Sequence, residues 1–169
     1  MEKPVRSLIE GRPVLVVIDT HKNACSRIPQ LIEAARKHGV PIVYASDAAA
    51  EFAVQAEVRP NEYLVRHRRH SVFYGTELPI LLRELGAGTV ILAGGETSVS
   101  VHYSFVDAHQ YDYFCRVVQD CMAGSSPRAH EAALRAMEYM QTGARRQCDE
   151  VIAAFDAVPE IASQDRVNS

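Results

Sequence analysis

Unbroken apolar runs alternate along the chain with segments that place apolar residues on one helical face. The runs at 13–19, 41–46, 89–93 and 113–118 are rich in β-branched residues and have no regular polar positions. This pattern is typical of strands buried on both faces, as in parallel sheets. Residues 63–66 predict one more, shorter strand.

Helical segments separate these runs. In the first, Ser26 is a candidate N-cap, apolar residues recur at helical spacing, and Gly39 ends the segment. Further helices are predicted from Thr76 to Gly86, from Thr97 to about Tyr111 and from Ser126 to Met140, and residues 148–157 predict a last short helix or strand.

The alternation of strands and helices predicts the fold class. A strand, a helix and a second strand within about this length imply a right-handed parallel crossover. We therefore expect a three-layer α/β/α protein with a doubly wound, mostly parallel sheet. Residues 1–169 are expected to form a single domain, with a loop or weak helix at 47–61 and a flexible tail at about 162–169.

The composition of the chain limits the classes of partner that it is expected to bind. The 169 residues are 47% hydrophobic, enough for one sizeable core, and the net charge of −3 gives no case for nucleic-acid binding. Four cysteines show no CxxC spacing, the first six residues (MEKPVR) contain no apolar h-region, and no apolar run approaches the roughly 20 residues that span a bilayer. We expect a cytoplasmic protein with free thiols and no membrane partner. Cys121, beside Asp120 at the end of a predicted strand, is a candidate exposed thiol.

The segment Leu92–Ala108 carries the strongest signal for a site. It leaves an apolar strand, turns on two glycines and enters a helix whose first turn contains Thr97 and Ser100. A helix N-terminus at the carboxyl end of a parallel strand offers unpaired N–H groups that can hold an anion or stabilise an oxyanion. Ligands of open α/β sheets collect at this edge, so we expect a small-molecule ligand or substrate there.

Three blocks together resemble a known family. Val17-Ile-Asp19, the segment 67–76 (HRRHSVFYGT), and the segment 92–101 (LAGGETSVSV) with Asp107-Ala108 are similar in order and spacing to the signature blocks of the isochorismatase-like cysteine hydrolases. The resemblance covers about residues 12 to 140. It implies a six-stranded parallel sheet, an Asp, Lys, Cys triad that hydrolyses amides through a thioester-type intermediate, and a homo-oligomer.

The resemblance also implies which positions form the site. The family's Asp falls on Asp19, its Lys on His67 and its Cys on Ser100, so two of three catalytic residue types are replaced. Its non-proline cis peptide falls between Gly95 and Glu96. The oxyanion turn of the family would then consist of Gly95, Glu96 and Thr97.

The family's metal cluster departs from its pattern in this chain. Asp47 stands where the family has an Asp, but Ala49 occupies the usual His position. A catalytic zinc or iron site needs three protein ligands, and Asp47 alone does not supply them. We expect no metal and no other cofactor.

The replaced residues decide which chemistry remains. A helix N-terminus and a nearby cation lower the pKa of a Cys thiol, whereas a Ser hydroxyl needs a base within hydrogen-bond reach. Asp19, His67 and Ser100 have the composition of a serine-hydrolase triad, which requires the imidazole between Ser and Asp. Alternatively, His67 fills the volume of the Lys, and Asp19 acts as acid or base on a small amide, ester or enol ether.

Each candidate residue also has a purely structural interpretation. Asp19 could cap its own loop, and His67 could belong to a solvated basic run, 66–70, that otherwise indicates an anionic ligand. Ser100 could be an ordinary helix residue bonding back toward Thr97. The alternative function is therefore a non-catalytic family member that binds a small ligand or serves as a structural partner.

Overall fold

The computed structural model describes residues 7–19, 25–48 and 58–158. Six strands form one sheet in the order β3-β2-β1-β4-β5-β6, and every pair is parallel. The strands are β1 (Arg12–Ile18), β2 (Ile42–Asp47), β3 (Tyr63–His67), β4 (Ala87–Gly95), β5 (Phe114–Ala123) and β6 (Arg145–Arg146). The expected six-stranded parallel α/β fold is confirmed.

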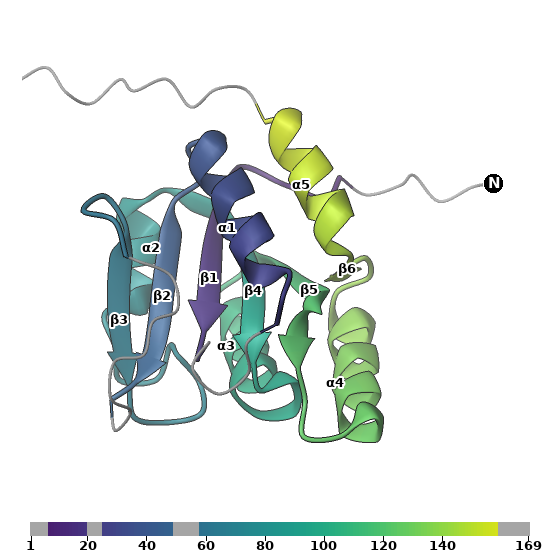
Figure 1. The fold of residues 1–169 in the computed structure, drawn as a ribbon. Coiled ribbons are helices and arrows are strands. Elements are labelled where there is room, and N and C mark those ends of the chain that lie inside the picture. Colours follow the sequence, from purple (N-terminus) through teal and green to yellow (C-terminus); the bar gives the residue numbers. More distant parts are fainter. Residues whose placement is uncertain (1–6, 20–24, 49–57, 159–169) are drawn as a thin grey trace, which may run out of the picture.

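Helices cover both faces of the sheet. They are α1 (Ile28–Lys37), α2 (Leu78–Glu84), the π-helical turn η1 (Thr97–Val101), α3 (His102–Gln110), α4 (Pro127–Met140) and α5 (Cys148–Asp156). Helices α1 and α5 lie on one face, and α2, α3 and α4 lie on the other (Figure 1). Two buried apolar clusters match these layers, so both faces of the sheet are core.

The apolar runs form strands because both of their faces are covered. Residues 14–18 of β1 are at most 1% exposed, and the neighbouring strands β2 and β4 are similarly buried. Helix α1 packs Leu31, Ile32 and Ala35 against the sheet, and Gly39 follows its end with φ +67°, a conformation that favours glycine. Helix α4 begins as predicted, with Ser126 accepting a hydrogen bond from the Ala129 amide.

Four local expectations were wrong. Ser26 does not cap α1, because the N-cap position falls on Arg27 and no side-chain hydrogen bond caps this helix. Strand β5 runs five residues past the predicted end at 118, so Cys121 is fully buried rather than exposed. The two-residue strand β6 was missed, because it is too short to show a periodic pattern. The helix expected from Thr97 starts as a π-helical turn, in which the Val101 amide donates to the carbonyl of Glu96.

Two further expectations concern segments that lie mostly or wholly outside the described residues. Most of the predicted loop at 47–61 and the whole predicted tail at 162–169 lie outside them. Within the described ranges, each helix is too short or too polar to cross a lipid bilayer.

Candidate active site

The sheet brings three strand ends together at its carboxyl edge. Parallel pairing aligns Ile18 with Ala45 and Asp47 with His67, so β1, β2 and β3 end side by side. Strand β4 pairs with the other side of β1 and leads directly into η1. Strand order reverses between β1 and β4, and ligand sites of doubly wound sheets lie at such a switch point.

Gly94 permits the close approach of β4 to the end of β1. It has φ +111°, and a Cβ at this position would lie 2.0 Å from the carbonyl oxygen of Ile18. Any side chain would therefore push the two strand ends apart. The next peptide bond, between Gly95 and Glu96, is cis, as the family resemblance implied.

Asp19 lies at the centre of the site. Its side chain is 1% exposed, and Oδ1 accepts hydrogen bonds from the Asp47 amide at 2.9 Å and from the His67 ring at 2.9 Å. Oδ2 accepts only a long hydrogen bond of 3.4 Å from Ser100 Oγ among the described residues. One carboxylate oxygen is therefore saturated, and the other retains capacity for a ligand.

Both ring nitrogens of His67 are occupied. Nδ1 lies 2.7 Å from the Arg69 carbonyl, which can only accept, so Nδ1 carries a proton. Nε2 lies 2.9 Å from Asp19, and the two groups share a second proton. Burial lowers the pKa of His67, but the hydrogen bonds to Asp19 and Arg69 and the negative charges of Asp19 and Asp47 outweigh it, so the pKa is raised.

Ser100 meets Asp19 from the other side. It is buried within η1, its Oγ donates to Asp19 Oδ2, and its carbonyl accepts a 2.6 Å hydrogen bond from Ser104. The distance of 3.4 Å between Asp19 and Ser100 confirms the prediction that their side chains meet at one edge of the sheet. The order of the three groups is Ser100, Asp19, His67, with the carboxylate and not the imidazole in the middle.

The turn before η1 has its own set of hydrogen bonds. Thr97 is fully buried, and its hydroxyl is 2.8 Å from Nδ1 of His130 on α4. Burial lowers the pKa of His130, with the charge of Arg145 adding to the effect. The Glu96 carboxylate accepts hydrogen bonds from the Ser98 hydroxyl and the Ser125 amide. These bonds direct Glu96 toward Ser125.

A cavity of about 290 Å³ opens above this group. The described residues that line it are Asp47, His67, Arg68, Arg69, His70 and Ser100. Asp19 lies beneath His67 and Ser100, and both of them contact the cavity. Of the predicted candidates, His67 and Ser100 therefore line the cavity and Asp19 contacts both of them, whereas Gly95, Glu96 and Thr97 form the adjacent turn.

Sequence reasoning did not assign the residues that anchor the loop after β3. Ser71 Oγ donates to Asp107 of α3 at 2.5 Å, and the Val72 amide donates to Ser104 Oγ at 3.0 Å. Ser71 and Asp107 lie in the blocks that carry the resemblance, which is the available signal for them. Ser104 lies four residues after Ser100, one helical turn along the chain.

The described part of the chain does not bring a set of metal ligands together at the carboxyl ends of the strands. No group of three or more His, Cys, Asp or Glu side chains there has a metal-binding arrangement, and Ala49 lies outside the described residues. The absence of a metal remains a prediction.

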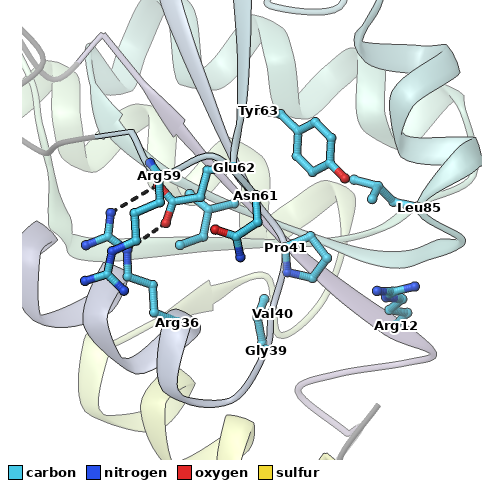
Figure 2. A pocket seen from close by; sticks show the side chains of 11 residues that line it. Arg12, Arg36, Gly39, Val40, Pro41, Arg59, Asn61, Glu62, Tyr63 and Leu85 are labelled. Carbon is cyan, nitrogen blue, oxygen red and sulfur yellow. Dashed lines mark hydrogen bonds and ion pairs between the residues drawn. The ribbon is translucent and has the colours of Figure 1, made fainter. Parts of the chain in front are cut away.

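A second cavity, of about 250 Å³, lies at the opposite edge of the sheet (Figure 2). Arg36 of α1 donates to both oxygens of Glu62, at 2.6 and 3.1 Å, and the Arg59 amide donates to the same carboxylate at 2.8 Å. These groups lie at the amino-terminal ends of the strands, whereas Asp19 lies at the carboxyl end of β1. None of the predicted site residues lines this cavity.

The fold is that of a doubly wound α/β protein, and the cavity above His67 and Ser100 lies at the switch point of the sheet, where proteins of this architecture bind ligands. Residues 14–148 match the isochorismatase domain model. The chain belongs to the isochorismatase domain family.

Individual relatives show how far this similarity extends. An uncharacterized isochorismatase family protein of Bacillus subtilis, YwoC, is 32% identical over 103 residues, which cover 61% of this chain and 54% of the relative. Maleamate amidohydrolase of Pseudomonas putida is 34% identical over 85 residues, covering 50% and 40%. The chain thus matches about half the length of these curated relatives.

Solved structures agree with the fold. An isochorismatase-like hydrolase from Alkaliphilus metalliredigens superposes with a TM-score of 0.79 at 21% identity, covering 85% of this chain and 99% of the other. At this identity the similarity supports the fold alone.

Proposed function

We propose that the chain is a hydrolase of small molecules in which the Asp19–His67 pair supplies acid–base catalysis. The observation that carries this proposal is the central position of Asp19, with one oxygen bound to His67 and the other facing Ser100. A buried pair that shares a titratable proton beneath a cavity is suited to proton transfer.

The replaced triad residues support an acid mechanism. Because both nitrogens of His67 are occupied, the imidazole does not receive a proton from Ser100, and a serine-hydrolase relay is not formed. A carboxylate paired with an imidazolium is also a weak base for a serine hydroxyl. In our proposal His67 occupies the position of the family's Lys as a cation, and Ser100 positions the substrate rather than attacking it.

The proposed reaction conserves the shared proton. With an enol ether, the proton moves from His67 to Asp19 and then to the terminal vinyl carbon of the substrate, which leaves an oxocarbenium ion. Water adds to the oxocarbenium carbon and gives a proton back to the pair. The resulting hemiketal then breaks its bond to the leaving oxygen, which takes up a proton, and a carbonyl compound and an alcohol are released. An enol ether suits the mechanism best, because its cleavage begins with protonation and needs no covalent nucleophile; small esters and amides are the further candidates.

A panel of small enol ethers, esters and amides tests the proposal with the full chain. We expect Asp19→Asn to lower kcat/KM about 10² to 10⁴-fold, the range of general acid–base catalysis, and Ser100→Ala to retain most of the activity. Activity should also fall as pH rises through the raised pKa of His67, because the pair then loses its proton.

Other outcomes separate the alternatives. Loss of activity in both variants, with phosphonate labelling of Ser100, would establish a covalent serine mechanism instead. Turnover that survives Asp19→Asn contradicts the role of Asp19. If the parent protein turns over no member of the panel, the non-catalytic alternative is favoured.

A further inference from the structure

The cavity above Asp19 has a basic rim. Arg68, Arg69 and His70 line it and are exposed. Within the described ranges, neither Arg68 nor Arg69 forms an ion pair with a carboxylate; the Arg69 guanidinium donates only to the Arg68 carbonyl, at 3.3 Å. Two arginines that form no ion pair with a described carboxylate thus line the same cavity as His67, whose charge Asp19 compensates from beneath.

The backbone that carries these arginines is fixed to the site. The Arg69 carbonyl accepts a hydrogen bond from His67 Nδ1, so the rim and the acid–base pair are directly joined. On the other side, Ser71 is held by Asp107 and Val72 by Ser104, both on α3. Bonds on both sides of the arginines hold the backbone in place before a ligand arrives, which lowers the entropic cost of binding.

A tilted pair of aromatic rings adjoins the arginines. The His70 ring lies against Tyr103, with ring centroids 5.4 Å apart. A neighbouring cavity of about 420 Å³ shares Arg69 and His70 with the first one and continues along Tyr74 and Tyr103. Aromatic surfaces beside guanidinium groups suit a planar ligand that carries negative charge.

We propose that Arg68 and Arg69 form a carboxylate-binding subsite, so that the substrate is a small planar monocarboxylate. The identification of the carboxylate as a substrate rests on the proposed function, whereas its binding at this subsite does not require turnover. A planar carboxylate matches the fork of an arginine, which can bind it with two parallel hydrogen bonds. A phosphate dianion is disfavoured, because Asp47 lines the same cavity and Asp19 lies beneath it.

Binding of benzoate and benzamide to the full chain tests the subsite, since these probes differ in charge and share a ring. We expect benzoate to bind at least about tenfold more tightly at low ionic strength, with an advantage that shrinks as salt screens the arginines. The double variant R68Q/R69Q should lose at least about tenfold in benzoate affinity and keep its affinity for benzamide. Isothermal titration calorimetry measures all four values.

Arg66→Gln is the matched control. Arg66 is exposed on β3, two residues from Arg68, and does not line the cavity, so its replacement should leave benzoate binding unchanged. Circular dichroism and urea unfolding confirm that the variants are folded. If benzoate binds selectively but the enzyme assays show no turnover, the subsite stands and only the proposed activity fails.

Three results overturn the subsite. The first is equal affinity for benzoate and benzamide, or binding of neither up to its solubility limit. The second is a loss of benzoate affinity in Arg66→Gln as large as in the double variant. The third is tighter binding of inorganic phosphate than of benzoate, which would make the rim a phosphate site.

Discussion

Buried ion pairs lie at both edges of the sheet, and their surroundings differ. At the amino edge, Arg36 and Glu62 are 13% and 3% exposed and bind through two contacts, and a backbone amide also binds Glu62 (Figure 2). At the carboxyl edge, His67 and Asp19 are 4% and 1% exposed and share one contact. Burial alone therefore does not distinguish them.

The two pairs differ in open hydrogen-bonding capacity and in the cation. Both oxygens of Glu62 have strong donors, and the guanidinium of Arg36 keeps its proton at any physiological pH, so this pair suits a structural role. Among the described residues, Oδ2 of Asp19 has one long contact, and the imidazole of His67 is titratable, with a pKa that its hydrogen bonds and the neighbouring negative charges raise. A buried ion pair indicates a chemical site when one carboxylate oxygen can still accept a hydrogen bond and the proton of the pair can be transferred.

Breaking the pair at the amino edge should have the largest effect on stability. We expect Arg36→Ala to lower the free energy of unfolding by about 3 kcal/mol, because Glu62 is left buried without its partner. Urea denaturation measures the loss. Arg135→Ala, which breaks an exposed pair with Glu131, is the control and should change little. Equal losses in the two variants would contradict a structural role for the Arg36–Glu62 pair.

Breaking the pair at the carboxyl edge should cost less. For His67→Ala we expect a loss of about 1–2 kcal/mol, because Asp19 keeps the Asp47 amide and water can enter from the cavity. The same urea experiment measures it, with His70→Ala as a control on the exposed rim. A loss larger than that of Arg36→Ala would show that the His67–Asp19 pair is the more structural of the two.

The pH dependence of stability should also separate the pairs. The pKa of His67 is raised, so its contribution is complete below the ordinary value of 6.5 and is lost as pH rises through the folded-state pKa. The stability difference between the parent and Asp19→Asn should therefore shrink from pH 6 to pH 9. A difference that stays constant over this range would mean that His67 is neutral in the folded protein.

The pair at the amino edge should show no such change. Burial raises the pKa of Glu62, but hydrogen bonds from Arg36 and the Arg59 amide outweigh it, so the pKa is lowered. Its contribution is present above the ordinary value of 4.5 and is lost only as pH falls. The stability difference between the parent and Arg36→Ala should accordingly stay flat from pH 6 to pH 9 in the same titration.

The smallest effect is expected at the long contact between Ser100 and Asp19. Ser100→Ala should change the free energy of unfolding by less than about 1 kcal/mol, because a 3.4 Å hydrogen bond is weak and Asp19 keeps its two stronger donors. Thermal or urea unfolding measures this change. A larger loss would mean that the hydroxyl contributes more to folding than its geometry indicates.

The sequence predicted the strands more completely than it predicted the contacts of the candidate site. Four of the six strands follow from apolar runs, because burial on both faces leaves a pattern of residue types, and β3 was predicted from the shorter segment 63–66. The ends of parallel strands converge, so the meeting of Asp19 with Ser100 was also predictable. The Arg69 carbonyl and the Asp47 amide were not, because every residue has these backbone groups and no residue type marks their use.

The π-helical turn makes the number of residues before α3 important as well as their identity. The Val101 amide reaches back five residues to Glu96, so η1 contains one residue more than an α-helical turn would. Deleting a residue from this turn would restore the α-helical repeat and rotate the side chains on one side of the cut by about 100° relative to the other. Ser100 would then turn away from Asp19, although every residue of the candidate site would still be present in the chain.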